Sequence, residues 1–80
     1  MYVVYILESI NFKKVFYKGY TTDLKQRIRR HNSGEIVSTT KYKPWKIIFY
    51  SVFSDRNKAL AFEKYLKSGS GIAFMRKRLI

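Results

Sequence analysis

The absence of cysteine is the feature that most constrains how this chain can fold, because the sequence has only 80 residues. A chain of this length buries about 60% of the surface that its unfolded form exposes, so it supports one hydrophobic core. Neither a disulfide framework nor a cysteine-based zinc site can reinforce that core. Hydrophobic residues make up 46% of the sequence and aromatic residues 18%, which is enough side-chain area for a packed interior. We therefore predict a single domain over residues 1–80.

The charge of the chain is the second constraint. Lysine and arginine number 17 against 5 acidic residues, which gives a formal net charge of +12 at pH 7. Such an excess stores electrostatic self-repulsion and is typical of proteins that bind a polyanion. We therefore expect nucleic acid as the partner. Two other interpretations are a charge that serves solubility alone and attraction to an anionic membrane surface, although no long amphipathic helix supports the latter.

The N-terminal run Met1–Leu7 is apolar, but it ends at Glu8. This is far short of the roughly 20 residues that cross a bilayer. No basic segment precedes the run and no small-residue cleavage site follows it, so we expect no secretory signal. The lack of cysteine also allows a reducing compartment. These features predict a cytoplasmic protein with no membrane partner.

Three segments of strand length are rich in β-branched and aromatic residues. They are residues 2–7, 15–20 and 46–53. A polar stretch separates the first two, and this arrangement predicts a hairpin. The third strand comes much later in the chain, so it must reach the hairpin through a connection that contains other structure.

Helix signals follow the second strand. Thr21 or Thr22 offers an N-cap, and Gly34 provides a stop, which predicts a helix over residues 23–32. The following residues, 33–45, are mostly polar and include glycine and proline, so we expect a long loop there. Loops of this length are often functional.

A second set of helix signals follows the third strand. Ser54 or Asp55 can cap a helix that runs to about Lys67, and the glycines from Gly69 onward break it. A short basic helix is expected from about residue 72. The order of elements is therefore ββαβαα, which is an α+β fold.

This order, together with a set of spaced motifs, resembles the GIY-YIG nucleases, particularly the small stand-alone group related to the N-terminal nuclease module of the excinuclease. The resemblance covers nearly the whole chain. It implies a three-stranded antiparallel sheet flanked by helices, one divalent metal ion and hydrolysis of a nucleic-acid phosphodiester. The matching segments are Val3-Val4-Tyr5, Tyr17-Lys18-Gly19, Tyr20–Leu24, Arg27, His31–Gly34, Pro44-Trp45 and Glu63–Gly69.

Two positions depart from the family pattern. Lys18 stands where the second signature has an apolar residue, and Tyr20 stands where the excinuclease module has lysine. Lys18 either adds positive charge near the phosphate or marks a site that has lost its catalytic use.

Tyr5 and Tyr17 lie on the two strands that the hairpin pairs, so their hydroxyls can converge at one end of the sheet. The resemblance implies that Tyr17 is the general base and that Tyr5 assists it through a hydrogen bond. A free tyrosine has a pKa near 10, so a base role requires nearby positive charge. The alternative is that both are aromatic core residues with satisfied hydroxyls.

Arg27 and His31 lie on the first predicted helix beside the buried stripe that Leu24 and Ile28 define. The resemblance makes Arg27 the residue that forks two phosphate oxygens and stabilises developing charge. The alternative is a surface arginine paired with Asp23. His31 either hydrogen-bonds a tyrosine or a phosphate, or is a partly buried structural histidine. A metal-ligand role is weak because the chain has no second histidine.

Glu63 borders the apolar side of the second predicted helix, where an unpaired carboxylate would be costly. The resemblance makes it the single protein ligand of Mg²⁺ or Mn²⁺, with water and substrate phosphate completing the coordination. The alternative is an i,i+4 pair with Lys67, and the two roles can coexist. We expect Glu63 to meet Tyr5, Tyr17 and Arg27 around one pocket at the sheet edge.

Further basic and aromatic residues fit contacts to the substrate, because basic side chains attract phosphates and aromatic rings stack on bases. The same pattern also describes a solvated basic face, and the tryptophan can instead be a core residue under the long loop. The candidates are Lys18, Lys41, Lys43, Trp45, Lys64, Arg76, Lys77 and Arg78.

These features favour a metal-dependent endonuclease that hydrolyses nucleic-acid phosphodiester bonds, with DNA favoured over RNA. The alternative is a non-catalytic, basic nucleic-acid-binding module that retains the fold. Specificity would come from the small domain itself or from a protein partner.

Overall fold

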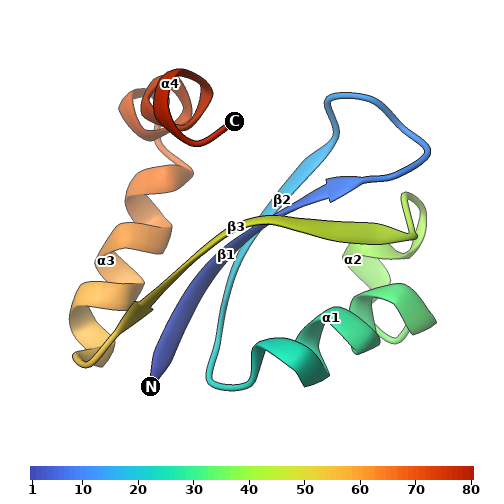
Figure 1. The fold of residues 1–80 in the computed structure, drawn as a ribbon, viewed down its shortest axis with the longest axis horizontal. Coiled ribbons are helices and arrows are strands. Elements are labelled where there is room, and N and C mark those ends of the chain that lie inside the picture. Colours follow the sequence, from blue (N-terminus) through green and yellow to red (C-terminus); the bar gives the residue numbers. More distant parts are fainter.

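A three-stranded antiparallel sheet forms the centre of the computed structural model, which describes residues 1–80 (Figure 1). The strands are β1 (Tyr2–Ser9), β2 (Phe16–Thr21) and β3 (Trp45–Phe53), in the order β2-β1-β3. Both neighbours pair with β1 in the antiparallel sense. This confirms the predicted hairpin and the α+β class. It also leaves β2 as an edge strand.

The central strand is buried on both faces because its apolar residues run without interruption from Val3 to Leu7. Successive side chains of a strand point to opposite faces. Val4 and Ile6 accordingly belong to one core cluster, and Tyr5 and Leu7 belong to another. The sheet therefore needs a cover on each side.

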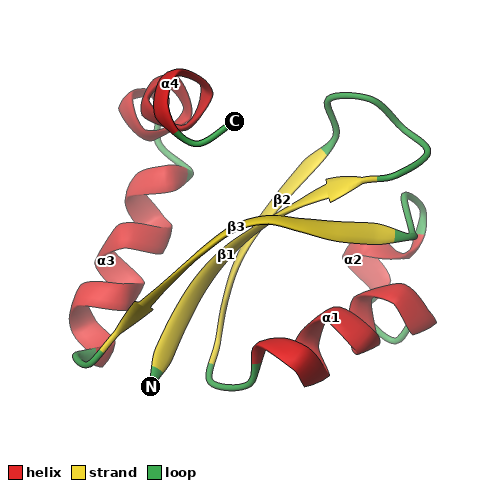
Figure 2. Ribbon diagram, in the orientation of Figure 1, coloured by secondary structure: helices red, strands yellow, loops and turns green.

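Different helices supply the two covers, as the arrangement in Figure 2 shows. Helix α1 (Leu24–Ser33) packs its apolar residues on the cluster around Tyr5. Helices α3 (Arg56–Leu66) and α4 (Gly69–Arg78) pack on the cluster around Val4 and Ile6. None of these helices has the length and apolar character needed to cross a membrane.

The helix starts follow local capping chemistry. Asp23 caps α1, because its side chain accepts a hydrogen bond from the Gln26 amide. The expected caps Thr21 and Thr22 are wrong, since the Thr21 hydroxyl instead bonds the backbone of Asp23. Asp55, one of the two expected residues, caps α3 by accepting from two amides.

Helix α4 begins at Gly69, earlier than expected, because Ser68 caps it by accepting from the amide of Gly71. The glycines therefore start a helix where a break was expected. A Cβ at position 71 would lie 1.7 Å from the backbone oxygen of Tyr65. Glycine at this position allows α4 to turn directly off the end of α3.

The segment 33–45, expected as a loop, contains one short helix, α2 (Val37–Thr40). Its first turn has no side-chain cap, so it lacks the signal that marks other helix starts. Burial stabilises it instead. Thr39 is 1% exposed and faces the core, a tertiary contact that no local pattern reveals.

Candidate active site

The ring of Tyr5 lies over the edge strand β2. Tyr5 is opposite Gly19 in the β1–β2 pair, and paired residues share a sheet face. A Cβ at position 19 would lie 2.4 Å from both Cζ and the hydroxyl oxygen of Tyr5. Only glycine leaves room for this ring. The tripeptide Tyr17-Lys18-Gly19 thus has a steric reason for its last residue, which places a buried tyrosine hydroxyl close to the open edge.

His31 holds that hydroxyl from the other side. Its Nε2 lies 2.9 Å from the Tyr5 hydroxyl, and its Nδ1 lies 2.7 Å from the hydroxyl of Thr39. The imidazole is fully buried. Burial, with the positive charges of Arg27 and Arg30, lowers the pKa of His31 to about 4. The ring is therefore neutral near pH 7 and has one donor and one acceptor.

One arrangement of protons gives every hydroxyl and ring N–H of this network a partner. The Thr39 hydroxyl donates to the backbone carbonyl of Ile36 at 3.3 Å, and so accepts from Nδ1–H of His31. Nε2 is then the acceptor, and the Tyr5 hydroxyl donates to it. This assignment follows from the network, as it must for hydrogen positions. The Tyr5 oxygen keeps its lone pairs free for a donor at the site.

Tyr5 is a poor base at this position. Burial raises its pKa to about 12, and the neighbouring hydroxyl of Tyr17 adds to the rise. The guanidinium of Arg27 opposes the rise, and the carboxylate of Glu63 adds a smaller increase. The same hydroxyl is thus within electrostatic reach of three of the residues that were expected to gather at the sheet edge.

Tyr17 lies half-buried among aromatic rings. Its ring centroid is 5.0 Å from that of His31, 6.3 Å from that of Tyr5 and 6.5 Å from that of Trp45. Its hydroxyl has no hydrogen-bond partner within the protein, in contrast to that of Tyr5. Tyr17 is therefore the less constrained of the two hydroxyls.

Arg27 has no carboxylate partner. One of its terminal nitrogens donates to the backbone carbonyl of Tyr20 at 3.4 Å. The alternative pair with Asp23 does not form, since that carboxylate caps α1. The remaining guanidinium donors face no acid, which is the arrangement required to receive an oxyanion.

Glu63 reaches the site from α3, which packs on the opposite sheet face from α1 (Figure 1). Its Oε2 accepts from Nζ of Lys67 at 3.2 Å, so the i,i+4 alternative is present. No group of three or more metal-ligating side chains exists. A divalent cation at Glu63 would therefore have one protein carboxylate. A hard oxygen donor of this kind fits Mg²⁺, which keeps much of its water.

The expectation of a pocket at this edge is wrong. The cavity that the structure contains lies elsewhere, beside the end of α4. Tyr17 and Glu63 approach β2 from its two faces, so the gathered side chains border an open edge. A sequence pattern gives the face of each side chain but not whether the surface between them is hollow.

The substrate-contact candidates divide by burial. Lys41, Lys43, Lys64, Arg76, Lys77 and Arg78 are exposed, and Lys18 is half-buried. Burial lowers the pKa of the Lys18 ammonium, and the positive charges of Lys67 and Arg76 lower it further.

Trp45 is a correction, because it is only 4% exposed and cannot stack on a base. Its indole N–H donates to the Thr39 carbonyl at 3.0 Å, and its backbone exchanges two hydrogen bonds with the Asn32 side chain. The alternative interpretation, a core residue under the loop, is the right one.

Sequence reasoning missed two residues of the site. Gly19 counts in the sequence only as the last residue of a motif, although its lack of a side chain positions Tyr5. Thr39 lies in the segment expected as a loop and carries no signal of its own. Its polar neighbours Ser38 and Thr40 give no reason to choose it.

Comparison with known proteins gives the chain relatives along most of its length. The family described as the GIY-YIG catalytic domain matches residues 1–73. UPF0213 proteins of Streptococcus pyogenes serotypes M3, M1 and M5 are each 38% identical over 65 residues, which cover 80% of this chain and 68% of each relative. The fold, the spaced motifs and these matches agree, and the chain belongs to the GIY-YIG family of nuclease-type catalytic domains.

Proposed function

We propose that this chain is a metal-dependent endonuclease that hydrolyses phosphodiester bonds in nucleic acid, with DNA favoured as the substrate. The observation that carries the proposal is the environment of the Tyr5 hydroxyl. A neutral, buried His31 holds it at 2.9 Å, while Tyr17, Arg27 and Glu63 all act on its charge.

The two tyrosines take different roles. Tyr5 keeps its proton near pH 7, because its pKa is raised to about 12, and it serves as a fixed hydrogen-bonding group. Tyr17 has a free hydroxyl and is therefore the residue that takes a proton from the attacking water. His31 acts through Tyr5 and stays neutral.

Arg27 binds the scissile phosphate. Its free guanidinium donors can contact two phosphate oxygens at once, and these contacts strengthen as negative charge develops in the transition state. A positive group that has no acid to neutralise it is well suited to this task.

Glu63 would hold Mg²⁺ or Mn²⁺ through its carboxylate. Lys67 already places an ammonium 3.2 Å from Oε2, so the carboxylate attracts a cation at this position. A bound divalent ion supplies positive charge to the phosphoryl oxygens. We place the protein in the cytoplasm, with specificity provided by the domain itself or by a protein partner.

A non-catalytic nucleic-acid-binding module is the second candidate. Two observations favour it: the Glu63–Lys67 ion pair and the lysine at position 18 of the second signature. The net charge of +12 predicts salt-sensitive binding for both candidates, so binding alone does not separate them.

The separating experiment is cleavage of single-stranded, duplex and branched DNA and RNA with Mg²⁺ or Mn²⁺, against a chelator control. An endonuclease cuts at least one of these in a metal-dependent way. A folded protein that binds the whole panel and cuts none of it would make the chain a binding module.

A further inference from the structure

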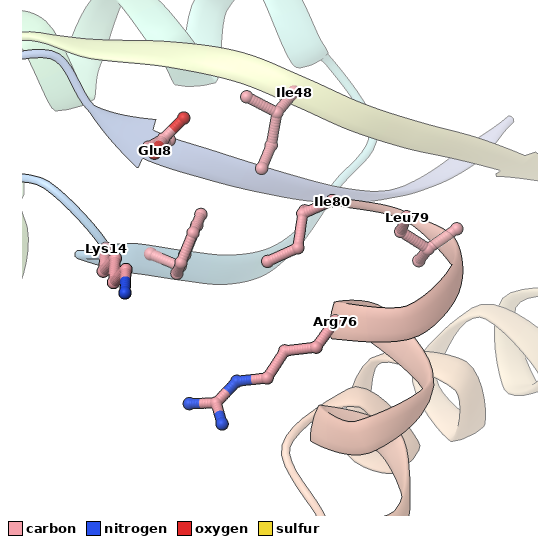
Figure 3. A pocket seen from close by; sticks show the side chains of 7 residues that line it. Glu8, Lys14, Ile48, Arg76, Leu79 and Ile80 are labelled. Carbon is pink, nitrogen blue, oxygen red and sulfur yellow. The ribbon is translucent and has the colours of Figure 1, made fainter.

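A cavity of about 630 Å³ lies on the sheet face that α3 and α4 cover. Its apolar wall consists of Phe16, Ile48, Leu79 and Ile80. Figure 3 shows Leu79 and Ile80 at the end of α4 beside Ile48 of β3. The volume lies within the range of sites that hold small organic molecules.

The charges at this cavity favour an anion. Arg76 and Lys14 line it, and neither has a carboxylate within ion-pair distance. The one acid of the lining, Glu8, is already paired with Lys46 at 3.7 Å. A ligand that combines an apolar, flat body with a negative group would match the wall and the cations together.

A row of cations connects the cavity with the candidate active site. Phe16 and Lys18 are two residues apart on β2 and therefore share a sheet face. The positive charges of Lys67 and Arg76 act on Lys18, and Lys67 contacts Glu63. The row thus begins at Glu63 and ends at Arg76 on the cavity. Cations in a row next to an aromatic wall are how proteins follow a phosphate backbone and stack its bases.

We propose that this cavity holds an unpaired base of the nucleic-acid strand that is cut at the β2 edge, with the adjoining phosphate on Arg76. This rests on the proposed function and adds the substrate class. A base can enter the cavity only where it has no partner, so the substrate is single-stranded or carries an unpaired nucleotide near the cut. The same chemistry, a base bearing a phosphate, also describes a free nucleotide, and the test must separate the two.

The test measures binding in the presence of chelator, so that cleavage plays no part. A short single strand is compared with a strand of equal length whose residues all lack bases. The intact protein should bind the first on the order of tenfold more tightly, because one stacked base contributes roughly that much. In Ile80→Trp, which fills the cavity without a change of charge, this ratio should fall several-fold. Ile80 is exposed, so the variant should fold, and melting checks this.

A matched pair of arginine variants tests the phosphate contact. Arg76→Gln and Arg78→Gln remove the same charge from the same helix, but only Arg76 lines the cavity. Arg76→Gln should reduce the preference for the base-containing strand, whereas Arg78→Gln should weaken both strands equally. Equal effects of the two variants would overturn the proposal.

Two further arms fix the source of the base. Adenosine monophosphate that binds in an Ile80-dependent way, while the strand shows no base preference, would assign the cavity to a free nucleotide and overturn the proposal. A blunt duplex that binds as tightly as the single strand would also overturn it. A preserved base preference without cleavage of any substrate would instead remove the nuclease assignment and leave the base-binding cavity.

Discussion

The hydroxyl of Tyr5 lies directly above Gly19, so closely that a Cβ at position 19 would lie 2.4 Å from it. The position of the hydroxyl therefore depends on the absence of one methyl group on the neighbouring strand. This relationship links a backbone position to the chemistry, because the same hydroxyl is held by His31 on its buried side.

Gly19→Ala should reduce turnover by on the order of 100-fold with a small effect on substrate affinity, because displacement of a positioned group by about 1 Å costs that much. Gly69→Ala is the matched control, since a Cβ there meets nothing within 4 Å. The measurements are kcat, KM and thermal melting of both variants. Unchanged turnover in Gly19→Ala would show that the position of Tyr5 does not matter.

The free energy of unfolding should depend on pH through His31. In the unfolded chain its pKa is about 6.5, and in the folded protein it is about 4. Between these values the unfolded state binds the extra proton, so the contribution is complete above about pH 7 and is lost as the pH falls toward 4. The loss should amount to a few kcal/mol at most. Urea unfolding between pH 4 and 7 measures it, and His31→Gln should reduce the slope. Equal slopes would contradict the buried neutral state.

Thr39→Val removes the hydroxyl that lies 2.7 Å from Nδ1 of His31. An unpaired buried polar group costs about 1–3 kcal/mol, and the imidazole also loses its orientation. Turnover should therefore fall more than affinity. Thr39→Ser keeps the hydroxyl and should recover most of the turnover. A similar loss in both variants would indicate that the methyl group, and not the hydrogen bond, is important.

Arg27→Ala should lower kcat by roughly 10²- to 10³-fold while substrate affinity changes little, because the guanidinium acts on charge that develops during the reaction. Arg29, an exposed arginine of the same helix, supplies the control variant Arg29→Ala. Single-turnover cleavage and binding in chelator measure the two quantities separately. Reduced affinity with normal kcat would reassign Arg27 to ground-state phosphate binding.

Glu63→Gln retains the shape of the side chain but removes the charge that a hard cation requires. Metal-dependent cleavage should disappear, and affinity for nucleic acid should hold or improve. If Glu63 serves only Lys67, the change costs about 0.2–0.5 kcal/mol of stability and cleavage survives. Glu35→Gln, at an exposed acid paired with Arg30, is the control. Mg²⁺ titration of cleavage and parallel melting decide between the two roles.

Most of the fold could be predicted from sequence because its signals are local. Runs of β-branched and aromatic residues indicated the strands, and caps such as Asp55 indicated the helix starts. The missing parts depend on tertiary contacts. Helix α2 is stabilised by the burial of Thr39, and α4 could start at Gly69 only because position 71 must approach the backbone of α3.

The candidate site divides in the same way. Hairpin pairing and helix phase placed Tyr5, Tyr17 and Arg27 near one another, because these are short-range relationships. The burial of Trp45 could not be predicted, since it depends on hydrogen bonds to Asn32 and Thr39. The open form of the site also depends on the packing of separate helices.

Strand β2 has a free backbone edge, and edges of this kind invite pairing with a strand of another molecule. Here the free edge is the place where Tyr5 from one face and Glu63 from the other come within electrostatic reach. An added strand along β2 would cover that place. Self-association through this edge and access of a substrate are therefore mutually exclusive, and the positive charge of Lys18 on the strand repels a second copy while it attracts a phosphate.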